Sequence, residues 1–232
     1  MCVDVRWQAI AQGLYFTSCL TQCMFLHTKS LLTAGTDGHT AIWPLSGEGT
    51  QPTTDSTTLT LGWQQPVRIH QSSSKAMASH QHDAWTKLIV SGGDDGSIAI
   101  MLLSTTSLTA AYTAAPVLLN RTHASAVTAC AITKHKERTF IATSGNDQWV
   151  RLWEVSICEV GSDIRTPAGG AYEKSISDVH RLGKIKTNVA DVSSIAVLEA
   201  HEDAEAARVL VCGVGMEVIR LGWDVDTSNY HR

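Results

Sequence analysis

An eleven-residue pattern occurs three times in this chain, and it limits what the chain can fold into more than any other feature. The copies are TAGTDGHTAIW at residues 33–43, SGGDDGSIAIM at residues 91–101 and TSGNDQWVRLW at residues 143–153. In each copy a serine or threonine stands four positions before an aspartate, and a tryptophan or methionine stands six positions after it. Equal internal spacing with spacers of unequal length is typical of repeat proteins. The sequence therefore predicts one structural unit that is used several times.

Each copy places a turn between two apolar runs, which predicts a β-hairpin. The hairpin strands are expected at residues 30–34 and 39–45, 87–91 and 97–103, and 140–143 and 149–155. One more strand is expected before each hairpin, at residues 3–7, 75–78 and 126–132. An outer strand is expected after each hairpin, at residues 59–63, 117–120 and 185–187.

A fourth unit lacks the aspartate turn. Its strands are expected at residues 191–198, 208–212 and 216–221, with the glycines of residues 213–215 as its turn. The chain is therefore predicted to be one all-β domain of about four four-stranded units, at residues 2–63, 64–120, 121–187 and 188–223. The polar linkers 46–58 and 161–170 are predicted to be flexible surface loops.

Composition favours a soluble cytoplasmic protein. Hydrophobic residues make up 44% of the 232 residues, which is ample for a packed core, and no apolar run approaches the roughly 18–20 residues of a membrane helix. The first residues lack the order of a secretion signal, and no membrane contact is expected. The net charge of −4 argues against binding nucleic acid through charge alone. The six cysteines are expected to be buried thiols rather than disulfides.

Several residues suggest chemistry, but a structural explanation fits each of them better. The aspartate pair at residues 94–95 contains the turn aspartate of the repeat and its solvated neighbour. Cys19, Cys23 and His27 offer three zinc ligands without a fourth nearby. The glycines of residues 212–215 lack the following helix that a nucleotide loop needs. The sequence therefore predicts no catalytic residue, metal, cofactor or small-molecule substrate.

The repeated residues resemble the WD40 repeat, whose four-stranded sheets are blades around a central channel. In that family a histidine, a hydroxyl residue, the turn aspartate and a tryptophan form one hydrogen-bonded network. The resemblance implies His123, Thr143, Asp147 and Trp153 in the third unit, His70, Ser91 and Asp95 in the second, where Met101 replaces the tryptophan, and Thr33, Asp37 and Trp43 in the first. Replacing Asp147 by alanine is expected to cost about 1–3 kcal/mol, because its donors lose a buried acceptor.

Five stretches resemble one branch of this family more closely. They are IHQSSSKA at residues 69–76, SGGDDGSI at 91–98, HASAVTAC at 123–130, VADVSSIAVL at 189–198 and VLVCGVGMEVIRLGWD at 209–224. They look like the carboxyl end of the large WD-repeat partner subunit of the tRNA wobble-position ribose 2′-O-methyltransferase. Members of that branch are far longer, so the resemblance implies a partial propeller.

The resemblance implies a non-catalytic scaffold whose partner is a tRNA ribose methyltransferase and whose contact with tRNA is indirect. The basic loop with Lys134, Lys136 and Arg138 is the candidate for direct contact with RNA phosphates. Two other functions stay open. One is a general WD40 adaptor in another cytosolic complex, for trafficking or ubiquitin ligation. The other is a hydrolase built on a propeller, which would need acidic or histidine residues at inward strand positions.

Overall fold

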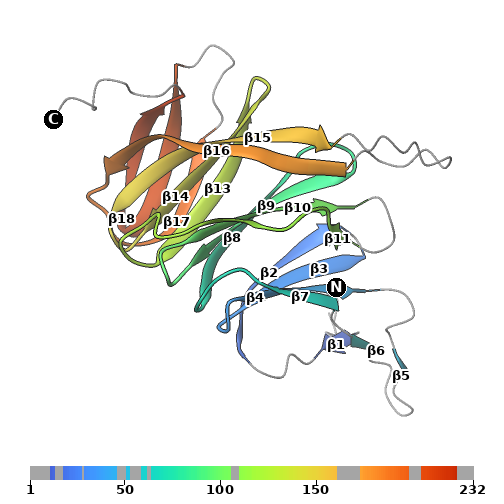
Figure 1. The fold of residues 1–232 in the computed structure, drawn as a ribbon. Coiled ribbons are helices and arrows are strands. Elements are labelled where there is room, and N and C mark those ends of the chain that lie inside the picture. Colours follow the sequence, from blue (N-terminus) through green and yellow to red (C-terminus); the bar gives the residue numbers. More distant parts are fainter. Residues whose placement is uncertain are drawn as a thin grey trace, which may run out of the picture.

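The structure of this protein is a computed structural model that describes residues 11–13, 18–27, 29–45, 51–52, 59–61, 64–105, 110–160, 173–198 and 205–223. The helices and strands assigned in these residues are all strands, which confirms the all-β prediction. Four large antiparallel sheets follow one another along the chain and stand side by side in an arc, from the blue to the red end of the sequence (Figure 1). Within this part of the chain, no helix has the length and apolar character needed to cross a membrane.

The strands of each large sheet are mostly consecutive in the sequence. The first sheet contains β2 (Leu20–His27), β3 (Ser30–Gly35), β4 (His39–Pro44) and β7 (Gln64–Arg68). The second contains β8 (Ser74–Gln81), β9 (Thr86–Gly93), β10 (Ile98–Ser104) and the short strands β11 (Ala111–Tyr112) and β12 (Val117–Leu119), which both pair with β10. The third contains β13 (Val127–His135), β14 (Arg138–Gly145), β15 (Trp149–Val160) and β16 (Glu173–Lys186). The fourth contains β17 (Ala190–Leu198) and β18 (Ala206–Gly222). A small separate sheet contains β1 (Ala11–Gly13), β6 (Leu59–Leu61) and β5 (Gln51–Pro52).

Apolar side chains fill the spaces between neighbouring sheets, and the second sheet shows how. Its side chains packed with the first sheet are Ile89, Ala99, Met101 and Leu103. Its side chains packed with the third sheet are Leu88, Val90, Ile98, Ile100 and Leu102. Successive residues of a strand point to opposite faces, so a strand buried on both faces is apolar throughout. Each large apolar side chain buried in this way contributes about 1.5–3 kcal/mol.

The first strands of the four sheets lie next to one another. β2 contacts β8, β8 contacts β13, and β13 contacts β17. Hydroxyl side chains connect them: Thr21 Oγ1 donates to the Ser74 carbonyl over 2.7 Å, and Thr128 Oγ1 donates to the Val192 carbonyl. The later strands of each sheet lie farther out, which is the arrangement of blades in a β-propeller. The fold is a partial propeller, and we number its four large sheets blades 1 to 4 in chain order.

Blade 1 differs from its prediction in both flanking strands. Its first strand is β2, and the predicted strand at residues 3–7 lies outside the described residues. Its outer strand is β7, whereas residues 59–61 form β6 and pair with β1 and β5. Blade 1 thus reaches Arg68, past the predicted limit at residue 63. Residues 59–61 alternate in polarity and residues 64–68 do not, yet pairing with β4, which the sequence does not display, places residues 64–68 in the blade.

The predicted loops are only partly described. Residues 51–52 of the predicted loop 46–58 form the short strand β5, so the prediction is wrong there, and the remaining residues of that loop lie outside the described part. The predicted loop 161–170 also lies outside it. After this loop, β16 is much longer than the expected strand at residues 185–187, because it pairs with β15 from Trp149 to Val160. Its many polar residues hide the strand pattern in the sequence.

Blade 4 contains two strands in the described residues rather than the three placed by the sequence. β18 includes both predicted strands and the glycine turn between them. Val214 pairs with the start of β17, whereas the Trp223 ring stacks on His135 at the end of β13, with centroids 4.5 Å apart. The starts of β13 and β17 are bonded to each other, so Val214 and Trp223 lie at opposite ends of the blade. The chain therefore doubles back after Val214, next to Gly215, whose φ is 104°.

Candidate functional site

Blade 3 brings together the four residues of its predicted network. His123 lies in the loop before β13, and its Nε2 is 3.0 Å from Thr143 Oγ1 on β14. The same hydroxyl accepts a hydrogen bond of 3.0 Å from Trp153 Nε1 on β15. His123 Nδ1 is 3.0 Å from Asp147 Oδ1 in the turn between these strands. The network therefore ties the loop before the blade to its second and third strands and to their turn.

Arg151 also belongs to this network, although the family pattern does not include it. Its NH1 group is 3.1 Å from Asp147 Oδ2 and 2.5 Å from His123 Nδ1. Nδ1 can donate to the carboxylate or accept from the guanidinium, but not both at once, so two proton arrangements are available. In either arrangement Asp147 is the anion that neutralises Arg151. Arg151 is 7% exposed, which makes this a buried ion pair.

Burial and hydrogen bonding set the charge states of this network. Burial lowers the pKa of His123 and outweighs the hydrogen bond with Asp147, which acts in the opposite direction. Burial raises the pKa of Asp147, but hydrogen bonds from His123 and from the backbone N–H groups of Ala124 and Trp149 outweigh it and hold the pKa below its ordinary value. His123 is therefore neutral and Asp147 ionised at neutral pH.

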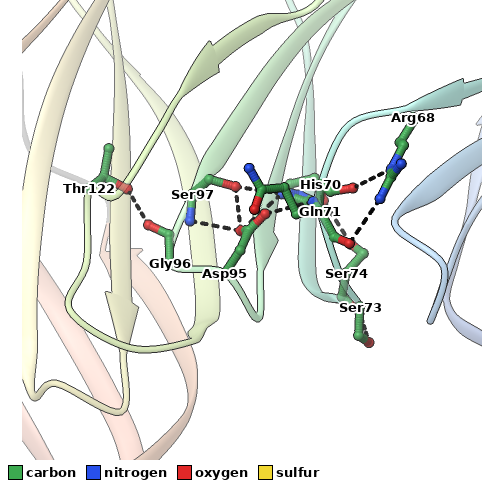
Figure 2. Close-up of polar contacts among 10 residues, drawn as sticks. Arg68, His70, Gln71, Ser73, Ser74, Asp95, Gly96, Ser97 and Thr122 are labelled. Atoms are coloured by element: carbon green, nitrogen blue, oxygen red, sulfur yellow. Dashed lines mark hydrogen bonds and ion pairs between the residues drawn. The ribbon is translucent and has the colours of Figure 1, made fainter.

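Blade 2 builds a related network with an added serine. His70 Nε2 is 3.0 Å from Ser91 Oγ, and its Nδ1 is 2.8 Å from Ser97 Oγ, which donates to Asp95 Oδ1 (Figure 2). Asp95 Oδ2 also accepts the backbone N–H of Gln71 over 2.7 Å. His70 Nδ1 and Asp95 are 3.6 Å apart, so Ser97 carries most of their connection. Burial lowers the pKa of His70. Burial raises the pKa of Asp95, but the hydrogen bonds from Ser97 and Gln71 outweigh it and hold this pKa below its ordinary value.

Two positions of the implied networks, Met101 in blade 2 and Asp37 in blade 1, make other contacts. Met101 stands where the tryptophan is expected in blade 2, and it is fully buried between blades 1 and 2. In blade 1, Trp43 Nε1 donates to Thr33 Oγ1 over 2.7 Å, as the resemblance implies. Asp37 Oδ1 accepts the backbone N–H of His39 over 3.1 Å. The structure thus brings Thr33 and Trp43 together, and Asp37 caps its own turn.

Each turn also binds the next unit through its backbone. The carbonyl of Gly38 accepts from the N–H of His70 over 3.1 Å, and that of Gly96 accepts from the N–H of His123 over 3.0 Å. The third turn has Gln148 at this position, whose carbonyl accepts from Thr187 over 2.9 Å. All three turn residues have positive φ, which glycine tolerates best. The repeat therefore positions each network through the turn of the preceding blade.

One of these units also matches a known family. Residues 116–154 match the family described as WD domain, G-beta repeat. The chain contains a WD40 repeat. The matched residues include the four that the hydrogen bonds of blade 3 bring together. No curated protein matches the chain.

The WD40 networks have the connectivity of a catalytic triad, since a histidine lies between a hydroxyl and a carboxylate. Thr143 and Ser91 are 0% exposed, however, so no substrate atom can reach their oxygens. Thr143 is bonded to Trp153, and Ser91 lies 2.8 Å from Ser74 Oγ. A nucleophile needs an open position beside its oxygen, and here neighbouring side chains fill that position. These hydroxyls hold the blades in place.

The predicted metal candidates do not converge. Residues four apart on an extended strand are about 13 Å apart, so Cys19, Cys23 and His27 are spread along β2 and the residue before it. The described residues contain no group of three or more potential metal ligands. The five described cysteines are free, but Cys19, Cys23 and Cys158 are exposed, so the prediction of buried thiols is wrong for them. Cys23 and Cys158 lie on strand segments with one face in solvent, and Cys19 directly precedes β2.

A polar cavity of about 160 Å³ lies along the first strands of the blades. Its lining residues come from all four blades: Gln22, Lys75, Ala76, Met77, Thr128, Ala129, Cys130, Ser193, Ser194 and Ile195. Gln22 Nε2 donates to the Lys75 carbonyl over 3.0 Å within this region. The cavity is therefore the axial channel of the WD40 blades, lined by hydroxyl, amide and ammonium groups.

The basic loop that was considered for RNA contact is largely neutralised. Lys134 Nζ is 3.0 Å from Glu137. Arg138 forms two hydrogen bonds with Glu154, of 2.6 and 2.7 Å, and a third with the Trp223 carbonyl. Lys136 is exposed in the turn, with a φ of 54°. Contact of this loop with RNA stays a prediction, and Lys136 is its most accessible cation.

We expect acid to destabilise the protein in two steps. The folded-state pKa values of His70 and His123 are lowered, so the unfolded state binds protons first as the pH falls below about 6.5, and the free energy of unfolding falls by up to about 1.4 kcal/mol per pH unit for each histidine. The lowered pKa values of Asp95 and Asp147 give a second loss below about pH 3.9. Urea unfolding between neutral pH and about pH 5 measures the first step.

A matched pair of variants identifies the source of the first step. The His123→Gln variant should lose stability less steeply with falling pH than the unmodified protein. The Asn146→Ala variant changes an exposed residue of the Asp147 turn that carries no titratable group, and it should keep the original slope. Equal slopes in all three proteins would contradict the assignment to His123.

Proposed function

We propose that this chain is a non-catalytic WD40 scaffold that binds a tRNA ribose methyltransferase acting at the wobble position. The observation that carries the scaffold role is the WD40 repeat at residues 116–154, since WD40 domains typically mediate protein–protein interaction. In this proposal the methyltransferase supplies the chemistry, and the blades supply a rigid binding surface.

The use of the polar residues supports a role without catalysis. The histidines and hydroxyls of the networks in blades 2 and 3 are buried, and they are bonded to one another and to half-buried aspartates. Asp94, the neighbour of the turn aspartate Asp95, is exposed, and its carboxylate lies 4.0 Å from Lys75 Nζ. A propeller hydrolase would need free acidic or histidine groups at inward positions, and the described lining of the axial channel contains neither.

Blade 4 offers apolar surface for a protein partner. Alternate side chains of β17 and β18, such as Val192, Val209 and Leu221, are buried against blade 3. On the opposite face, Val214 and Met216 are 70% and 77% exposed. In blades 2 and 3 the corresponding faces are covered by the next blade. Contiguous exposed apolar side chains of this kind often mark protein interaction sites.

The methyltransferase partner is supported by the five stretches that resemble its WD-repeat subunit. Two of them lie at junctions between blades. Residues 69–76 run from the end of blade 1 into β8, and residues 123–130 run from the loop before blade 3 into β13. A third, residues 209–224, contains most of β18 and its reversal. The resemblance thus falls on the segments that join blades as well as on a strand pattern common to many propellers.

Affinity purification of the tagged protein from its own cells tests this proposal. The expected result is recovery of a ribose methyltransferase by mass spectrometry, with loss of wobble 2′-O-methylation after deletion of the gene. Unchanged methylation, together with no methyltransferase among the bound proteins, would contradict it. Recovery of trafficking or ubiquitin-ligase components instead would favour the general WD40 adaptor.

The exposed face of blade 4 gives this experiment a matched pair of variants. We expect Met216→Ser combined with Val218→Ser to reduce recovery of the partner at least about tenfold, as loss of two buried apolar contacts would. Phe25→Ser changes a side chain that is 66% exposed on blade 1, and it should leave recovery unchanged. The opposite pattern would place the partner on blade 1.

A further inference from the structure

The outer hairpin of blade 3 places three cations in a row. In antiparallel strands, residues directly opposite each other have their side chains on the same face. Lys186 lies opposite Trp149, Lys184 opposite Arg151, and Arg181 opposite Trp153. All six side chains therefore share one face of the sheet. Lys184 Nζ lies 4.6 Å from the centroid of the Trp149 ring, which agrees with this placement.

The row is evenly spaced and accessible. Successive positions on one face of a strand are about 6.6 Å apart, so the three cations span roughly 13 Å along β16. The register shift between Gly183 and Arg181 keeps Arg181 on the same face as the two lysines. Arg181, Lys184 and Lys186 are exposed, and β16 is the last strand of its sheet, so nothing in the described residues pairs with its outer edge.

The charges around this row do not balance. Arg151 adds a fourth cation beneath it, and the charge of Arg181 contributes to lowering the Arg151 pKa, after burial and against the effect of Asp147. Asp147 is already shared by Arg151 and His123. Within the described residues, no carboxylate forms an ion pair with the three exposed cations. On blade 4, the Glu217 carboxylate already accepts hydrogen bonds from Thr187 and Asn188, which directly follow β16.

We propose that Arg181, Lys184, Lys186 and Trp149 form a binding site for the backbone of single-stranded RNA. Evenly spaced cations along an exposed strand match the regular repeat of phosphates along a nucleic-acid chain. The Trp149 ring at one end, now covered by Lys184, offers a plane on which a base can stack. An extended acidic peptide also presents regularly spaced anions, but its carboxylate side chains provide no base that could stack on the Trp149 ring. The proposal is independent of which protein the scaffold binds.

Fluorescence anisotropy with a uridine RNA of about 15 nucleotides tests the site. Three phosphate contacts on a single strand give a slope of about −2 for the logarithm of the association constant against that of the salt concentration. We therefore expect affinity to fall about 20-fold between about 50 and 200 mM salt. Lys184→Gln combined with Lys186→Gln should reduce the slope to about −0.7 and weaken binding about tenfold or more at low salt.

Two exposed lysines on the first two blades supply a matched control. Lys29→Gln combined with Lys75→Gln removes the same charge and should change RNA affinity by less than about twofold. Lys184→Arg combined with Lys186→Arg keeps the charge and should keep binding. Circular dichroism verifies that each variant is folded. Equal affinities for the two glutamine variants would overturn the proposal. It would also be overturned if a polyglutamate peptide bound as tightly as the RNA, which would favour a protein ligand.

Discussion

Replacing Asp147 by alanine is expected to lower the free energy of unfolding by about 3–5 kcal/mol. The substitution removes the acceptor of two backbone N–H groups and leaves Arg151 as a buried charge without its anion. Breaking a buried ion pair costs more than losing a neutral hydrogen bond, because the remaining charge stays desolvated. The expected loss is therefore larger than the 1–3 kcal/mol that the sequence alone suggests. Urea unfolding measures it directly.

Two other aspartates make this prediction specific. Asp95→Ala should cost about 1–3 kcal/mol, because its partners are uncharged donors. Asp94 is exposed, so Asp94→Ala should change stability by less than about 0.5 kcal/mol. Adding Arg151→Leu to Asp147→Ala should restore part of the loss, since the unpaired charge is removed. Equal costs at Asp147 and Asp95 would show that Arg151 adds nothing to the network.

Gly96→Ala is the second large effect, with an expected cost of about 2–5 kcal/mol. Gly96 has a φ of 73°, which strains any residue with a Cβ by about 1–2 kcal/mol. An added Cβ would also lie 2.4 Å from the His123 carbonyl oxygen, so the loop before blade 3 would have to move. Overpacking of this kind costs about 1–3 kcal/mol more. Because the loop carries His123, the substitution should weaken the blade 3 network as well.

The third turn supplies the control for this prediction. Gln148 holds the equivalent position with a φ of 59°, and its own Cβ is already accommodated. Gln148→Ala removes only a hydrogen bond of 3.5 Å to the Val189 carbonyl and should cost less than about 1 kcal/mol. If Gly96→Ala costs no more than Gln148→Ala in urea unfolding, the close approach of the Gly96 turn to the His123 loop does not constrain the fold.

The hairpins could be predicted from the sequence because their strands and turns are neighbours in the chain. Turn residues and alternating apolar positions act locally, so β3–β4, β9–β10 and β14–β15 lie where the pattern expects them. The outer strands could not be placed as well. β7 and β16 are defined by pairing with β4 and β15, and their own polar residues give little local signal. A strand at the edge of a sheet needs only one apolar face, which weakens its pattern.

The network residues could be identified because the repeat fixes their spacing, but two members could not. Ser97 is replaced by His39 and Trp149 in the other copies, and Arg151 is replaced by Ala41 and Ala99. Comparison between copies therefore gives no signal at either position. One clue was present, since Arg151 is the single charged residue in the apolar run WVRLW. A charge at a buried strand position requires a partner. Glu154, three residues later on the strand, points to the opposite face, which leaves the turn aspartate four residues earlier as the candidate.

Hydrogen exchange of the tryptophan indole groups, followed by NMR, tests most directly whether these networks hold the blades together. The Nε1 protons of Trp43 and Trp153 are bonded to buried threonines and should exchange far more slowly than that of the exposed Trp85. In the Asp147→Ala protein, the Trp153 proton should lose its protection while that of Trp43 keeps it. If Trp153 exchanges as fast as Trp85 in the unmodified protein, the proposed locking of the blades is contradicted.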